Sequence, residues 1–184
     1  MPIEVELRSF ISQEKYVELM EFFSRNAEFI GEDIQETEYL GSENDAGSGK
    51  DLRIQKNQTH SKIWLKKGKI HDEKREEIEV KFERHDYNKV KSLLNELGHR
   101  TKIRWFRKRT RFDWDGVDVS LDNTKGYGYI IELELLVEDN EQDEALELLK
   151  RRFEKLNIKI TSREEFDRKF RHYSENWEQL LKED

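Results

Sequence analysis

The sequence predicts an α+β domain in which helices cover one face of an antiparallel β-sheet. Three observations carry this prediction. Several segments alternate acidic or basic residues with aliphatic ones, which is the two-residue period of a strand. Other segments repeat apolar residues at helical spacing. The pair Asp115-Gly116 is typical of the tight turn of a β-hairpin.

The elements can be justified in chain order. Ser12 is a suitable N-cap for a helix that extends to about residue 25 and has Phe23 in its apolar stripe. Asp86 is the expected N-cap of a second helix, and Gly98 is its expected stop because glycine readily takes the left-handed conformation after a helix. We expect one strand at 1–9 and a second strand that ends at Leu40. Further strands are expected at 51–56, 61–67, 76–82, 101–105, 106–113, 117–122 and 128–137, and further helices at 141–156 and 162–182.

Composition limits the classes of function. The chain has 184 residues, enough for one domain with a buried core, and 41% of them are charged. A net charge of -7 opposes nonspecific attraction to nucleic acid or anionic membranes, and the lack of cysteine excludes disulfides and thiolate metal sites. The sequence shows neither an apolar run of membrane-spanning length nor a signal-peptide pattern, so we expect a cytoplasmic protein without a nucleic-acid or membrane partner.

Charged residues occupy alternate positions on several predicted strands. Residues 4–8 read Glu-Val-Glu-Leu-Arg; acids alternate again in 75–80 and 129–136, and bases in 52–55 and 107–112. The apolar stripes of the helices must pack on the apolar faces of these strands. The charged faces then either form one solvent-exposed surface or line the inside of a closed tube. The dominance of Glu and Arg favours the tube, because these residues are costly to bury unless they are paired or bound to ions. A metal-bound polyphosphate would supply such partners.

One glycine-rich segment needs separate treatment. Residues 47–50 read Gly-Ser-Gly-Lys, but the spacing of a Walker motif is absent. Asp51 follows the lysine, where a P-loop has serine or threonine. We therefore do not expect a P-loop.

The motifs and their order resemble those of the CYTH domain family, the triphosphate tunnel metalloenzymes, which include class IV adenylyl cyclases, thiamine triphosphatases and tripolyphosphatases. The family signature Glu-x-Glu-x-Lys is matched at 4–8, with Arg8 in place of the lysine. Gln55 stands where many members have arginine, and the family's C-terminal Lys-Ser-Tyr has only 161–163 as its nearest equivalent. The family's other strand motifs are matched at 52–55, 64–67, 75–79, 107–109, 121–122 and 128–134.

The resemblance covers about residues 1–165 and carries implications for the fold. It implies a closed eight-stranded antiparallel β-barrel, a tunnel with helices packed outside it. It also implies that residues 1–165 form one domain and that residues 166–184 are a helical extension packed on the barrel.

The resemblance further implies a charged site inside the tunnel. The implied cofactor is Mg²⁺ or Mn²⁺, with the carboxylate ligands Glu4, Glu6, Glu77, Glu79, Asp122, Glu132 and Glu134. The implied phosphate-binding residues are Arg8, Arg53, Lys66, Arg75, Arg107 and Arg109. Lys67 is the alternative to Lys66, which we prefer because it shares a strand face with Trp64. The implied catalytic set is Glu4, Glu6, Arg8, Glu132 and Glu134.

The expected function is metal-dependent hydrolysis of a small triphosphate: inorganic tripolyphosphate, thiamine triphosphate or a nucleoside triphosphate. One alternative is a class IV adenylyl cyclase that converts ATP to cyclic AMP and pyrophosphate, and another is a noncatalytic polyphosphate-binding module. Both reactions use the same metal and cationic clamp, so the motifs leave these functions open. They also leave open whether the protein is a monomer or a homodimer.

Overall fold

The computed structural model describes residues 3–42, 50–67 and 76–183. Its helices and strands follow in the expected order. None of the helices within these ranges is both long and apolar enough to cross a membrane. The elements are β1 (Ile3–Ile11), α1 (Gln13–Asn26), β2 (Glu28–Gly41), β3 (Lys50–Lys56), β4 (His60–Lys67), β5 (Glu76–Glu83), η2 (Arg84–Asp86), α2 (Tyr87–Glu96), β6 (Arg100–Trp114), β7 (Val117–Thr124), β8 (Gly128–Val137), η3 (Asp139–Glu141), α3 (Gln142–Lys155) and α4 (Arg163–Glu183).

The strands form an antiparallel sheet, which confirms the predicted α+β class. Within the described residues the sheet has eight strands in the order β1-β8-β7-β6-β2-β3-β4-β5. Hydrogen bonding does not continue from β5 to β1 in this part of the chain, so hydrogen bonds do not close the sheet. The closed barrel therefore stays a prediction.

The chain divides into two compact units. The first comprises Met1–Glu32 and Lys108–Phe170, and the second comprises Asp33–Arg107 and Arg171–Asp184. Strands β2 and β6 and helix α4 each contribute residues to both units. The packing of residues 166–184 as an extension on a barrel stays a prediction.

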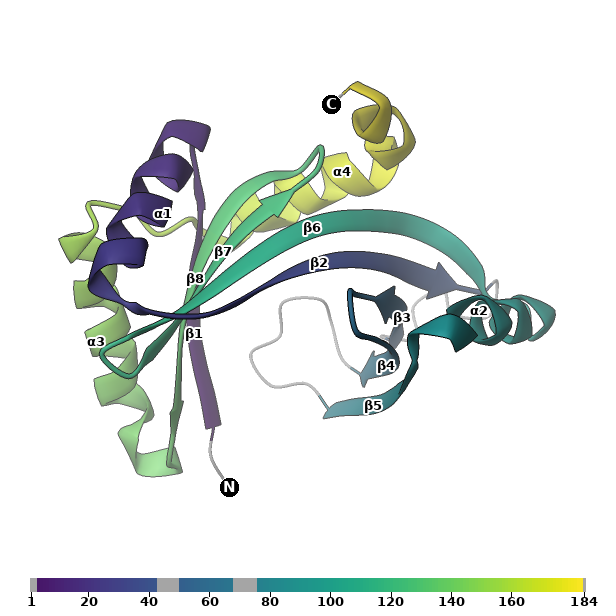
Figure 1. Ribbon diagram of the computed structural model, residues 1–184, viewed down its shortest axis with the longest axis horizontal. Coiled ribbons are helices and arrows are strands. Elements are labelled where there is room, and N and C mark those ends of the chain that lie inside the picture. The colour runs from purple at the N-terminus through teal and green to yellow at the C-terminus, as the bar shows by residue number, and fades with distance from the viewer. Residues whose placement is uncertain (1–2, 43–49, 68–75, 184) are drawn as a thin grey trace. The chain divides into compact units, whose positions relative to one another are not determined.

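Helices α1 and α3 supply the apolar cover of the first unit (Figure 1). Leu121, Ile131 and Leu133 alternate with polar residues along β7 and β8, and they are fully buried with Phe23 of α1 and Leu149 of α3. The apolar faces of these strands therefore pack against the two helices. The acidic and basic residues at the intervening positions therefore lie on the opposite face.

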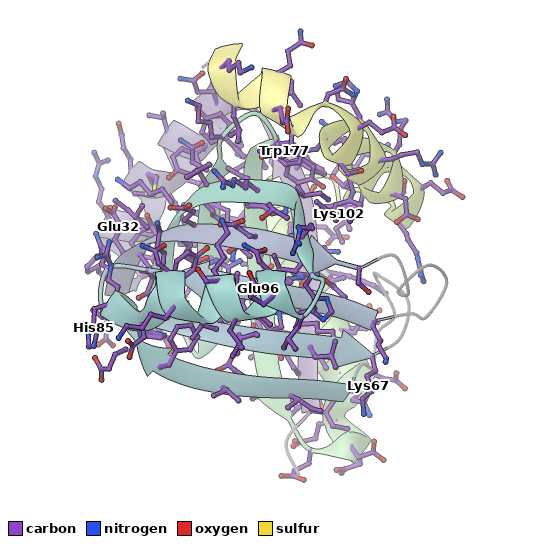
Figure 2. The ribbon with its side chains drawn as sticks, turned by 90° about the vertical axis from the view of Figure 1, so that its right-hand side faces the viewer. Glu32, Lys67, His85, Glu96, Lys102 and Trp177 are labelled. Atoms are coloured by element: carbon purple, nitrogen blue, oxygen red, sulfur yellow. The ribbon has the colours of Figure 1, made fainter. Side chains whose placement is uncertain are left out.

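Helix α2 supplies the apolar cover of the second unit (Figure 2). Tyr87 and Leu94 of α2 pack on Leu40 of β2 and Ile54 of β3. This cluster is small, so polar contacts carry part of the attachment of the helix.

A buried carboxylate provides those polar contacts. Glu38 on β2 is only 1% exposed. It accepts hydrogen bonds from Tyr87 Oη at 2.9 Å, from Lys91 Nζ at 2.6 Å and from the Thr101 hydroxyl. Burial raises the pKa of Glu38, but the hydrogen bonds from Lys91, Thr101 and Tyr87 outweigh burial and bring the pKa below its ordinary value. The charged form of Glu38 thus ties α2 to β2 and β6.

Three local predictions are confirmed. The Ser12 hydroxyl accepts a hydrogen bond from the Lys15 backbone N–H at 3.2 Å, which confirms the predicted cap of α1. Gly98 has a φ of 89° and ends α2 as expected. Asp115 and Gly116 have φ values of 53° and 81°, as a tight hairpin turn between β6 and β7 requires.

One local prediction was wrong, and a second was confirmed only in part. The expected strands at 101–105 and 106–113 are one continuous strand, β6, because nothing at their junction interrupts extended backbone. Asp86 is the N-cap residue of α2, as expected, but its side chain makes no capping hydrogen bond, since the chain enters α2 through the turn Arg84–Asp86. The Asp86 carboxylate instead accepts a hydrogen bond from Lys89 Nζ at 2.7 Å.

Candidate functional site

The charged face of the first unit gathers acids from three neighbouring strands. The register pairs Glu6 of β1 with Glu134 of β8, and Glu134 with Asp118 of β7. Arg8 of β1 pairs with Glu132 of β8 in the next same-face position. Directly opposed side chains in an antiparallel pair begin about 5 Å apart, so Glu6, Glu134 and Asp118 form a row across the sheet.

The acids in and next to this row repel one another. The partial burial of Glu6 and, next in size, its repulsion by Glu132 raise its pKa to about 7, although Arg8 acts in the opposite direction. Burial raises the pKa of Glu134 to about 8, with added repulsion from Glu4 and Glu132 and a hydrogen bond with Glu4. Glu6 and Glu134 therefore bind protons more tightly than free glutamates, because burial and the neighbouring acids disfavour their charged forms.

Arg109 is a largely buried cation of this face, with a side chain that is 19% exposed. Its Nε and Nη2 donate to the two carboxylate oxygens of Asp122, each at 2.7 Å, and Nη2 lies 3.3 Å from Glu132 Oε1. Burial works against the charge, but attraction to Glu132 and Asp122 is stronger and raises the pKa of Arg109 above its ordinary value. Asp122, predicted as a metal ligand, therefore has both oxygens engaged by Arg109.

Another cation of this face, Arg8, is oriented by an aromatic ring. Its guanidinium carbon lies 4.6 Å from the centre of the Phe166 ring in α4, and its Nε lies 3.8 Å from Glu6 Oε1. Phe166 also packs on Phe10, with ring centres 4.6 Å apart. A planar guanidinium stacks on an aromatic ring in a way that a lysine ammonium does not, so the replacement of lysine by Arg8 has a structural partner in Phe166.

In the second unit, Arg53 is held by an acid on its own strand. Its Nε donates to Asp51 Oδ1 at 2.8 Å, and its Nη2 donates to Asp51 Oδ2. The guanidinium carbon lies 4.0 Å from the centre of the Tyr39 ring and 5.9 Å from that of Trp64. The register places Lys66 opposite Asp51 and on the same strand face as Trp64.

Arg107 and Glu79 each have a partner in the second unit. Arg107 donates two hydrogen bonds to Gln35 Oε1, from Nε at 2.9 Å and from Nη2 at 2.6 Å. Glu79 accepts a hydrogen bond from Lys62 Nζ at 2.7 Å and lies 3.7 Å from Lys81 Nζ. The hydrogen bond from Lys62 is the largest influence on Glu79 and lowers its pKa.

The predicted site residues thus fall into two groups. Arg75 lies outside the described residues; Glu77 lies in β5, but its side chain is also outside what the structure describes. The second unit holds Arg53, Lys66, Glu79 and Arg107, and the first unit brings together Glu4, Glu6, Arg8, Arg109, Asp122, Glu132 and Glu134.

The sequence analysis missed several residues of these faces. Asp51 stands two positions before Arg53, and strand alternation could have identified it as a neighbour on the same face. Asp118 could have been found in the same way, four residues before Asp122. Gln35 and Phe166 carried no such signal, because their contacts depend on which strand or helix lies beside them.

The donor set of the first unit fits a divalent metal ion by its chemistry. Carboxylate oxygens are the ligands that Mg²⁺ and Mn²⁺ prefer. Burial is the largest cause of the raised pKa values of Glu6 and Glu134, and repulsion between the acids adds to it. A cation beside Glu4, Glu6, Glu132 and Glu134 would oppose both effects, because it favours the charged carboxylates. Within residues 3–42, 50–67 and 76–183, no three acidic or histidine side chains already converge in the geometry of a formed metal centre.

Comparisons with known proteins identify the family of this chain. A family model described as the CYTH domain matches residues 2–170. A protein of Methanocaldococcus jannaschii, named as a candidate adenylate cyclase, is 31% identical over 162 residues, which cover 85% of this chain and 90% of that protein.

Solved structures show the same fold. A Pyrococcus horikoshii protein is 29% identical, with a TM-score of 0.70 over 87% of this chain and 93% of that one. A Hippeastrum protein, described as a candidate adenylyl cyclase with a dominant triphosphatase activity, has a TM-score of 0.65 over 89% of this chain and 93% of its own. Its identity is 18%, so this likeness concerns the fold alone.

Proposed function

Because this chain belongs to the CYTH domain family, we propose that it is a metal-dependent enzyme that hydrolyses a small triphosphate. One observation carries the proposal: acids with raised pKa values, Glu6 and Glu134, share a sheet face with the arginines Arg8 and Arg109. Acids suit metal ions, and guanidinium groups suit phosphate oxygens. A metal-bound triphosphate needs both.

In this proposal, Glu4, Glu6, Glu132 and Glu134 hold Mg²⁺ or Mn²⁺. When bound, such an ion supplies charge neutralisation at the phosphate oxygens and activation of a water molecule. Asp122 acts on this group through its ion pair with Arg109. Glu77 and Glu79 complete the predicted acidic set.

The cations bind the phosphate chain and stabilise the charge that develops on it. Arginine can contact two phosphate oxygens at once, and phosphoryl transfer depends mainly on such positioning and neutralisation. The residues assigned to this role are Arg8, Arg53, Lys66, Arg75, Arg107 and Arg109. In the structure, Arg53 is oriented by Asp51 and Tyr39, and Arg8 by Phe166. Closure of the sheet into a tunnel is part of the same proposal.

A second candidate function is that of a class IV adenylyl cyclase. The name of the M. jannaschii relative favours it. In that reaction the ribose hydroxyl of ATP attacks the α-phosphorus and pyrophosphate leaves, whereas in hydrolysis water attacks the terminal phosphorus. The charged residues described above would serve either reaction.

Product analysis tests the proposal. The purified protein is incubated with Mg²⁺ or Mn²⁺ and, separately, with tripolyphosphate, thiamine triphosphate and ATP. We expect release of inorganic phosphate that stops when a chelator removes the metal. Cyclic AMP with pyrophosphate would instead identify the cyclase, and tight binding without turnover would identify a polyphosphate-binding module. Neither turnover nor binding with any of the three substrates would refute the proposal.

A further inference from the structure

The contact between Arg107 and Gln35 has a defined direction. A guanidinium can only donate hydrogen bonds, so the oxygen of the Gln35 amide faces Arg107. The Gln35 Nε2 donates to Asp33 Oδ2 at 2.9 Å, and a carboxylate can only accept. The two neighbours therefore fix which end of the amide points to Arg107. Asn57 Nδ2 also donates a hydrogen bond to Asp33 Oδ2, at 3.2 Å, and so helps to position the Asp33 carboxylate.

Strand β3 supports the same amide. Gln55 lies directly opposite Thr37 in the β2–β3 register, and its Nε2 donates to Thr37 Oγ1 at 2.7 Å. The same nitrogen lies 3.5 Å from Gln35 Oε1. Gln55 and Thr37 are 6% and 7% exposed, so this support is shielded from water. Gln55, which replaces an arginine in the sequence pattern, thus packs and hydrogen-bonds beside the residue that holds Arg107.

The contact of Gln35 with Arg107 differs chemically from the contacts that hold Arg109. The carboxylates of Asp122 and Glu132 hold Arg109 and oppose its charge. The contacts from Gln35 orient Arg107 through a neutral oxygen, which engages the Nε–Nη2 edge of the guanidinium without carrying a charge that competes with an anion.

We propose that Gln35 is a positioning residue that sets the plane of the Arg107 guanidinium for contact with substrate phosphate. This inference rests on the proposed function, since it concerns how the same site binds its triphosphate. It predicts that a change at Gln35 alters phosphate affinity through Arg107 and has little effect on affinity when Arg107 is absent.

Calorimetric binding of tripolyphosphate in the presence of Mg²⁺ measures the affinity. Gln35→Met keeps the length of the side chain but removes the acceptor, and we expect the Kd to rise about tenfold. Gln35→Glu keeps an acceptor but adds a charge that competes with phosphate, so the Kd should rise at least as much. In the Arg107→Ala background, Gln35→Met should change the Kd less than about twofold. Gln13→Met, at an exposed position in α1, is the matched control and should leave the Kd unchanged.

A second readout follows the guanidinium itself. The NMR signal of the Arg107 Nε–H group, assigned by its loss in Arg107→Lys, should shift in Gln35→Met and stay in place in Gln13→Met. An unchanged signal, or equal losses of affinity with and without Arg107, would overturn the role of Gln35. If the wild-type protein binds no triphosphate at all, the proposed function itself fails. Wild-type binding that Gln35→Met leaves intact would contradict only the positioning role.

Discussion

Arg109 on β6 and Asp122 on β7 form a two-point ion pair, with both donor–acceptor distances at 2.7 Å. Asp122 is 2% exposed, so the pair is shielded from water on its acidic side. Arg109 also lies 3.3 Å from Glu132 on β8. The pair therefore fixes a cation beside the acids that we assign to metal binding.

Asp122→Asn should destabilise the protein. The change leaves the buried guanidinium of Arg109 with a neutral partner in place of a carboxylate, and losing one member of a buried pair costs about 3 kcal/mol. The free energy of unfolding, measured by urea denaturation with a circular dichroism signal, reports this loss.

The same substitution at Asp118 provides the control. Asp118 lies on the same strand and pairs with Arg111, but the two side chains are 33% and 48% exposed. An exposed pair contributes less than about 1 kcal/mol, so Asp118→Asn should have a small effect. Equal losses in the two variants would show that burial of the Arg109–Asp122 pair does not matter.

Without metal, stability should fall as the pH rises from about 5 to about 8.5. The pKa values of Glu6 and Glu134 are raised to about 7 and about 8 in the folded protein, above the ordinary value of 4.5. The folded state then binds protons more tightly than the unfolded state over this range, and this advantage is lost as the two acids ionise. The Tm, measured in a chelator across this range, should therefore decrease.

Glu134→Gln should flatten this pH dependence because it removes the acid with the higher pKa. Glu144→Gln changes an exposed acid in α3 and should leave the slope as it is. A Tm that rises with pH in the wild-type protein would be inconsistent with crowded acids on this face.

Glu132→Gln should reduce turnover of the triphosphate by about a thousandfold or more while the fold is kept. A metal ion contributes several kcal/mol to stabilising the transition state, and removing one carboxylate ligand forfeits much of that contribution. Phosphate release is the measurement, and circular dichroism checks the fold. The matched control is Glu147→Gln, at an exposed acid in α3. Activity within a few-fold of the wild type in Glu132→Gln would exclude metal ligation by this residue.

Arg53→Ala should weaken substrate binding more than it slows the chemical step. Arg53 is held by Asp51 and stacked on Tyr39, so it offers a preorganised guanidinium to phosphate. We expect KM to rise about tenfold or more, since charge-assisted contacts contribute about 1.5–3 kcal/mol each. Steady-state kinetics measure this change, with Arg100→Ala at an exposed position of β6 as the control. An unchanged KM would remove Arg53 from the phosphate site.

Strand alternation made much of this arrangement predictable. Residues at every second position of a strand share a face, so the grouping of Glu4 with Glu6, and of Glu132 with Glu134, follows from the sequence. Their convergence depends on β1 lying beside β8, which strand alternation does not specify; the resemblance to a known family implied only that these acids share one metal site. Ser12 and Gly98 act over three or four residues, so the start of α1 and the end of α2 could also be predicted from the sequence.

Contacts between strands far apart in sequence were not predictable in the same way. The partner of Arg107 is Gln35, 72 residues earlier, and no local pattern specifies which strand lies beside β6. The absent capping hydrogen bond at Asp86 has a different cause: a short helical turn precedes α2, so the N-cap residue does not have the extended backbone of a usual cap. Closure of the sheet depends on its two edge strands, which no local signal describes.

The ring of Phe166 has a practical consequence for where the chain can be shortened. A protein ending at residue 165 would keep all the predicted site residues of the first unit, yet it would lose the aromatic ring that Arg8 and Phe10 contact. Arg8 would then sample several rotamers, and an anion would have to order it on arrival. Such a truncation would keep the predicted site acids and arginines of the first unit and still bind its ligand poorly.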